Sequence, residues 1–209
     1  MHKRNLQGDG VHEGGDIVIH NMRPLEPDLD MANAFLEALN PGGVFTFQTF
    51  CDRKDRPDRR LNRVFQGTLA QHCITLAKLN NSDAGVFVMV NEGDGVVHPG
   101  CRTCRTNANV VRVRSLFIDL DGAPLDPVLA LPEQPSMVVE SSSGRWHAYW
   151  HEVPCPTNDF AAAQVSLAKQ FNSDLSVKDL ARVMRLPGFW HQKGDPFQTR
   201  IVTLGKVQR

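Results

Sequence analysis

The stretch VRVRSLFIDLDG, residues 111–122, has the pattern of a strand that ends in a turn. Side chains on a strand alternate between two faces, so Asp119 and Asp121 share one face while Ile118 and Leu120 share the other. Two residues advance a strand by roughly 6.6 Å, so both carboxylates can reach one hard cation or an adjacent pair. Neighbouring carboxylates repel each other unless a cation lies between them. The stretch therefore predicts a Mg²⁺ or Mn²⁺ site that also takes triphosphate oxygens, with a polar Asp-Gly turn as the alternative.

A second motif follows in SMVVESSSGRWHAYWHEV, residues 136–153, which has the pattern of two strands joined by a turn at residues 142–144. Alternation places Arg145 and His147 on one face, and Trp146 on the opposite face, where it suits a core. A guanidinium beside an imidazole is a good contact for triphosphate oxygens. A histidine satisfied within the fold is the alternative interpretation.

The remaining patterns predict a mixture of strands and helices. We expect a poorly ordered head over residues 1–24 and a helix through residues 31–40 capped by Asp28 or Asp30. Strands are expected at 44–50, 85–90 and 198–204, a loop at 91–109, and helices at 61–79, 159–171 and 177–185. These elements do not follow a strict βαβ alternation, so the fold class is α+β with an antiparallel or mixed sheet.

The expected helix at 177–185 carries a third set of charged residues. Ser176 and Asp179 have the spacing of a capping box. Lys178, Arg182 and Arg185 would then form one basic stripe, for which a solvated helix face is the alternative. Asp174 lies in the loop before the cap, where it is either free to join another site or a turn residue.

Cysteines suggest a separate metal site. His98, Cys101 and Cys104 lie at two-residue spacings in HPGCRTC, which is compatible with three zinc ligands. A fourth ligand would have to come from elsewhere, and free cysteines in a loop are the alternative. Five cysteines without an export signal favour reduced thiols over a disulfide framework.

Composition is that of an ordinary globular protein, with 41% hydrophobic and 22% charged residues among 209. No apolar run is long enough to span a membrane and no secretory signal is evident, so we expect a cytoplasmic protein without a membrane partner. The formal net charge is zero, which is mild evidence against a nucleic-acid protein. Local basic patches matter more, and residues 51–63 form one that suits either a phosphate backbone or solvent.

The three charged segments, in this order, resemble the archaeo-eukaryotic primase superfamily, most closely its plasmid and phage replication primases and primase-polymerases. Its first motif is two acids one residue apart, as in Asp119 and Asp121. Its second is a small residue followed by a strand histidine, as in His147, and its third is a loop acid, placed here at Asp174. The segment ARVMRLPGFWHQK, residues 181–193, resembles a further family segment in which Leu-Pro-Gly lies between an arginine and a basic residue.

The resemblance implies a catalytic module with an RNA-recognition-motif-like sheet, residues 91–209, packed on a smaller N-terminal αβ unit, residues 25–90. It implies DNA-templated joining of nucleoside triphosphates on single-stranded DNA by a two-metal mechanism. The implied ligands of Mg²⁺ or Mn²⁺ are Asp119, Asp121 and Asp174, with His147 beside them. The implied nucleotide-binding residues are Ser143, Arg145, His147, Arg185 and Lys193. Complete replication proteins of the family often carry a further helical or helicase region, which would be a partner here.

Two other functions compete with this one. In a haloacid-dehalogenase-type phosphatase, Asp119 would be the nucleophile and Asp121 its acid-base partner. That family places its motif near the start of the domain, whereas 118 residues precede Asp119 here. A non-catalytic module that binds single strands on its sheet is the third possibility, and it leaves the paired acids unexplained.

Overall fold

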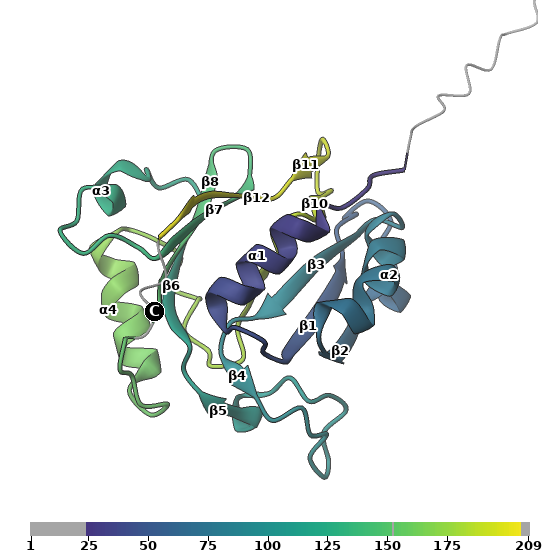
Figure 1. Cartoon of the computed structure of the whole chain (residues 1–209), viewed down its shortest axis with the longest axis horizontal. Coiled ribbons are helices and arrows are strands. Elements are labelled where there is room, and N and C mark those ends of the chain that lie inside the picture. The colour runs from purple at the N-terminus through teal and green to yellow at the C-terminus, as the bar shows by residue number, and fades with distance from the viewer. Residues whose placement is uncertain (1–23, 152, 206–209) are drawn as a thin grey trace, which may run out of the picture.

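The computed structural model describes residues 24–151 and 153–205 as two antiparallel four-stranded sheets with helices around and between them (Figure 1). The first sheet has the spatial order β2 (Arg63–Gly67), β1 (Phe45–Cys51), β3 (Ala84–Met89) and β9 (Val183–Arg185). The second has the order β12 (Arg200–Leu204), β7 (Met137–Ser142), β8 (Arg145–His151) and β6 (Ser115–Leu120). The α+β class with antiparallel sheets is therefore confirmed. The expected head, residues 1–24, lies almost wholly outside the described residues.

Three longer helices cover these sheets. Helix α1 (Leu29–Leu39) lies between the two sheets, α2 (Leu69–Asn80) packs on the first, and α4 (Phe160–Gln170) packs on the second beside the short α3 (Asp126–Leu129) (Figure 1). Asp28 caps α1 by accepting a hydrogen bond from the amide of Met31 at 2.9 Å, as one of the two expected caps. No helix in the described part of the chain is long and apolar enough to cross a membrane.

The two faces of the second sheet pack into two different cores. Phe117 and Tyr149 face α1, where the Phe35 and Tyr149 rings meet edge to face with centroids 5.5 Å apart. Ile118 and Ala148 point the other way, into the smaller core under α4. The alternation predicted for both strands is thus confirmed. The same alternation turns Asp119 and His147, which lie two residues from Phe117 and Tyr149 respectively, toward the space between the sheets.

One expected helix and one expected strand are wrong in part. The helix expected at 61–79 begins only at Leu69, because Thr68 and Gln71 form a capping box there. The residues before it form a 3₁₀ turn, Arg59–Leu61, and then β2, which pairs antiparallel with β1. The single strand expected at 111–122 is also two: β5 (Val110–Arg112) pairs with β4 (Glu92–Gly93), and β6 pairs with β8.

The helix expected at 177–185 does not form. Its last three residues are β9, which pairs antiparallel with β3 so that Arg185 lies opposite Phe87. A short helix is marginally stable by itself, and the edge of β3 offers these residues backbone partners, so tertiary pairing overrides the local pattern. Consequently the basic stripe of Lys178, Arg182 and Arg185 and the capping box at Ser176 are wrong.

Strand β9 also bears on the expected division of the chain at residue 90. It comes from the later part of the chain and completes the sheet that residues 45–89 begin. Small β10 (Trp190–His191) and β11 (Phe197–Gln198) follow it and lead back to β12 of the second sheet. The polypeptide therefore crosses between the two sheets three times, and the boundary between the two units stays a prediction.

Candidate active site

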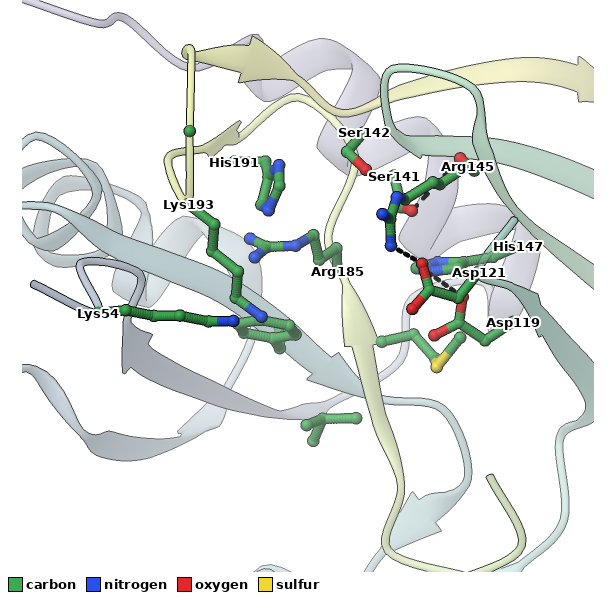
Figure 2. A pocket seen from close by; sticks show the side chains of 14 residues that line it. Lys54, Asp119, Asp121, Ser141, Ser142, Arg145, His147, Arg185, His191 and Lys193 are labelled. Atoms are coloured by element: carbon green, nitrogen blue, oxygen red, sulfur yellow. Dashed lines mark hydrogen bonds and ion pairs between the residues drawn. The ribbon is translucent and has the colours of Figure 1, made fainter. Parts of the chain in front are cut away.

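A pocket of about 480 Å³ opens between the two sheets, and the paired acids lie on its wall (Figure 2). Asp119 is the penultimate residue of β6 and Asp121 follows the end of that strand. Their side chains are 30% and 56% exposed, so both carboxylates remain accessible to a cation or a ligand. Both acids therefore face the same open space, as the alternation predicts.

Strand β8 places two nitrogen-bearing side chains beside these acids. Arg145 forms an ion pair with Asp121, and His147 Nε2 lies 3.8 Å from Asp119 Oδ1 (Figure 2). The register explains the second contact, because Asp119 of β6 lies directly opposite His147 of β8. Strand β8 begins directly after the turn at Gly144, whose φ of +69° suits glycine.

His147 is buried, which favours the neutral form of its imidazole. Burial lowers the pKa of its imidazole, and the nearby Asp119 carboxylate only partly opposes that effect. Its Nδ1 lies 3.3 Å from the hydroxyl of Tyr149, and within the described residues this hydroxyl has no other hydrogen-bond partner. In the tautomer with the proton on Nε2, His147 accepts from this hydroxyl at Nδ1 and offers the pocket an N–H donor.

The opposite wall of the pocket is basic. Arg185 lies there at the end of β9, with His191 from β10, Lys193 from the following loop and Lys54 from the loop after β1 (Figure 2). Burial, followed by the charge of Arg185, lowers the pKa of Lys193 and brings that of His191 to about 4. These two shifts indicate a partly dehydrated, positive surface, on which an anion is stabilised.

Comparisons with known proteins agree with this geometry. Residues 101–203 match the family described as the RepB DNA-primase N-terminal domain. The AEP domain of the cyanophage S-2L primase-polymerase has a TM-score of 0.65 at 19% identity, over 87% of this chain and 94% of that one. The catalytic domain of primase RepB′ in complex with initiator DNA has a TM-score of 0.58 at 18% identity, over 86% of each chain. Residues 101–203 thus resemble the RepB primase family, and the chain has the fold of the archaeo-eukaryotic primases. A search of curated protein sequences finds no match.

These similarities favour the primase interpretation of Asp119 over the phosphatase interpretation. The superfamily fold also accounts for the order of the motifs, because β6, the β7–β8 hairpin and β9 follow one another along the chain and meet at one pocket. The predicted set Asp119, Asp121, Arg145 and His147 is brought together, and Arg185 and Lys193 join it from the basic wall.

Two residues that the sequence predicted for this site, Ser143 and Asp174, do not line the pocket. Ser143 is at the exposed tip of the hairpin, whereas its neighbours Ser141 and Ser142 line the pocket. The backbone of Asp174 is next to the first motif, since its amide donates to the carbonyl of Asp119 at 3.1 Å. Its carboxylate, however, accepts hydrogen bonds from the amide and hydroxyl of Ser176 at 2.8 and 2.7 Å. Asp174 thus acts as a turn residue and does not line the pocket.

The expected zinc trio is not assembled. His98 Nε2 lies 3.0 Å from Asp94 Oδ2, and Cys104 is buried in the protein, where burial raises the pKa of its thiol. Among residues 24–151 and 153–205, no three His, Cys, Asp or Glu side chains are grouped so as to hold a metal ion. The structure therefore gives no support to zinc at these positions.

Sequence reasoning missed Lys54, His191 and the two serines of the hairpin as pocket residues. Lys54 belongs to the basic loop 51–63, whose composition alone left its role open. His191 lies in the segment of residues 181–193, two residues before Lys193. The resemblance of that segment to the primase family was therefore the only signal for His191. Both positions depend on how the sheets meet, which local patterns do not encode.

His147 provides a prediction that separates binding from stability. His147→Asn keeps a polar partner for Tyr149 but shortens the side chain, so one hydrogen bond to a charged phosphate oxygen is lost. Such a bond contributes about 1.5–3 kcal/mol, which corresponds to roughly ten- to hundredfold weaker nucleotide affinity. Equilibrium titration with a nucleoside triphosphate measures the effect.

Trp146→Ala is the matched control, because Trp146 packs against the smaller core on the opposite face of β8. It should lower the melting temperature and leave nucleotide affinity nearly unchanged in the folded protein. If His147→Asn lowers the melting temperature without weakening nucleotide binding, His147 is a core histidine.

Proposed function

We propose that this chain is a DNA primase or primase-polymerase, a nucleotidyltransferase that joins nucleoside triphosphates on a single-stranded DNA template. One observation carries the proposal: a single pocket sets the carboxylates of Asp119 and Asp121 opposite a basic wall that includes Arg185 and Lys193. A triphosphate needs both parts, because its oxygens bind cations at one end and basic side chains along its length.

The donor set fits Mg²⁺ or Mn²⁺. Both are hard cations that take oxygen ligands, and Mg²⁺ is commonly held by one or two carboxylates together with substrate phosphates. Asp119 and Asp121 would hold the ions; Asp174 enters the proposal through its position beside Asp119, and its carboxylate would have to leave Ser176. When bound, two such ions would activate the attacking hydroxyl and neutralise the leaving pyrophosphate.

The protein's own side chains would bind and orient the triphosphate. His147 would donate from Nε2, and Arg145, released from Asp121 as a cation takes its place, would pair with a phosphate oxygen. Arg185, Lys193 and Lys54 would add positive charge from the other sheet, where the lowered pKa of Lys193 favours an anionic neighbour. The amino acids that contact the nucleotide would thus come from both sheets.

The template is the second proposed ligand. The solved RepB′ relative is described as a complex with initiator DNA, and we carry DNA binding over to this chain as part of the proposal. The choice between ribo- and deoxynucleotides and the ability to start a chain without a primer are left to experiment.

The test is incubation of the purified protein with labelled nucleotides, single-stranded DNA and Mg²⁺ or Mn²⁺, with and without an annealed primer. We expect labelled products that lengthen with time and disappear on chelation of the metal. Products without a primer would establish priming, and products only with one would establish extension. Binding of DNA without any incorporation would overturn the proposal in favour of a single-strand-binding module.

A further inference from the structure

The basic wall of the pocket rests on one buried carboxylate that does not itself line the pocket. Asp52 follows β1 and its side chain is 1% exposed, while the side chain of its partner Arg185 is 9% exposed. Asp52 Oδ1 accepts from Arg185 Nη2 at 2.8 Å and Oδ2 accepts from Nη1 at 3.0 Å. This two-point pairing fixes both the position and the plane of the guanidinium.

Two neighbours confine the pair further. The guanidinium lies over the ring of Phe87, 4.7 Å from its centroid. Gly85, two residues before Phe87 on β3, packs so closely against the pair that a methyl group there would lie 2.7 Å from Arg185 Nη1 and 2.8 Å from Asp52 Oδ1. The backbone at Gly85 therefore leaves room for this pair and for little else.

Asp52 also holds the segment that carries the other basic-wall residues. Its Oδ2 accepts a hydrogen bond from the amide of Gln192 at 2.9 Å, between His191 and Lys193. Asn80 fixes the same segment from α2, accepting from the amide of Trp190 at 2.9 Å and donating to its carbonyl at 2.8 Å. A single carboxylate thus ties the end of β1 to both β9 and β10.

The arrangement has an electrostatic consequence for the pocket. Asp52 is covered, so a ligand in the pocket meets the guanidinium of Arg185 and not the carboxylate behind it. Two-point pairing uses one proton on each terminal nitrogen, and a guanidinium has five N–H groups. Within the described residues Arg185 has no hydrogen-bond acceptor other than Asp52, which leaves its other protons available to a ligand.

We propose that Asp52 is a positioning residue for triphosphate binding: it orients Arg185 and the His191–Lys193 segment so that their donors converge on the phosphates. The inference rests on the proposed function for the identity of the ligand. It assigns Asp52 no contact with the nucleotide and no part in bond making or breaking. Loss of Asp52 should therefore weaken binding of the polyphosphate and raise the KM for nucleotide, with a much smaller change in kcat.

The first test is Asp52→Asn, which keeps the shape of the side chain but removes its charge and one acceptor. Inorganic tripolyphosphate is titrated into the protein by calorimetry, and the KM for nucleoside triphosphate is measured with a primed template. We expect about a tenfold or greater rise in both the Kd and the KM. Asp58→Asn is the matched control, since Asp58 belongs to the same loop but pairs with Arg60 on the surface, and it should change neither value.

A second variant covers the case in which Asp52→Asn does not fold, because it leaves a buried arginine without its partner. Gly85→Ala keeps both charges and forces the pair to shift, so it should raise the Kd in the same direction. Unchanged tripolyphosphate affinity in either folded variant overturns the inference.

A double variant tests whether Asp52 acts through its partner. In an Arg185→Gln background, Asp52→Asn should raise the Kd much less than it does in the wild-type background. An equal rise in both backgrounds overturns the positioning role. If the wild-type protein incorporates no nucleotide, the proposed function fails, whereas the tripolyphosphate titrations still decide the role of Asp52.

Discussion

Replacing Asp119 and Asp121 together with asparagine is expected to reduce nucleotide incorporation to background. The substitutions keep the shape of both side chains and remove the two negative charges that face the basic wall. Mutation of residues that only support a metal ligand commonly reduces activity about 10- to 100-fold, so loss of two proposed ligands should reduce it by roughly a thousandfold or more. Incorporation of labelled nucleotide on a primed template, at saturating Mg²⁺ or Mn²⁺, measures the loss.

The fold should survive this change. Both acids are partly exposed, and the ion pair of Asp121 with Arg145 is at the surface, where such pairs contribute little to stability. The melting temperature should therefore stay close to that of the wild type. Asp126→Asn, on α3 and away from the pocket, is the control and should keep full activity. Normal incorporation by the Asp119 and Asp121 double variant would disprove the proposed catalytic site.

Asp174 can be separated from the pair in the same assay. Its carboxylate is hydrogen-bonded to Ser176, so Asp174→Asn should reduce incorporation less than the double change does. An effect as large as that of the double variant would show that Asp174 leaves its turn and joins the metal site.

The parts of the site that could be predicted from sequence are those set by local geometry. Alternation along β6 and β8 determines the face of its own strand that each of Asp119 and His147 takes, and the turn at Gly144 marks the start of β8. Neither feature depends on distant residues, whereas the pairing of β6 with β8 does. The predicted core face was confirmed for the same reason, because Ile118 and Ala148 follow from period-two patterning alone.

The parts that could not be predicted depend on distant segments. Arg185 was assigned to a helix because its charged neighbours recur at helical spacing, but β9 pairs with β3, which lies roughly a hundred residues earlier in the chain. Asp52 lies in the basic stretch 51–63, whose composition does not single it out, and its importance appears only when β1, β9 and β10 meet. Sequence patterns identify which residues can carry the chemistry, whereas the crossing between sheets determines which of them face each other.

The Leu186-Pro187-Gly188 turn lies where the chain leaves β9 of the first sheet and returns toward β12 of the second. Gly188→Ala is expected to destabilise the protein strongly. Gly188 has a φ of +86°, and its carbonyl accepts from the amide of Asp28 at 2.9 Å while its own amide donates to Thr199 at 2.7 Å. A methyl group at Gly188 would overlap the carbonyl oxygen of Asp28 and lie 3.2 Å from the amide nitrogen of Ala32. The substitution would therefore push the turn away from the start of α1.

Two effects add at this position. A left-handed backbone conformation costs about 1–2 kcal/mol for a residue with a side chain, and forcing a methyl group into a packed contact costs about 1–3 kcal/mol more. For a domain of this size each kcal/mol lowers the melting temperature by roughly 2–4 °C, so a decrease of about 5–15 °C is expected in a thermal denaturation scan.

Gly100→Ala is the matched control for the backbone effect alone. Gly100 has a similar φ of +81°, and a methyl group there would meet nothing within 4 Å. It should lose only the cost of the left-handed conformation, about 1–2 kcal/mol. Equal melting temperatures for the two variants would show that the contact between Gly188 and α1 is looser than the structure indicates. A clear difference would establish that this turn holds the basic wall of the pocket against the first helix.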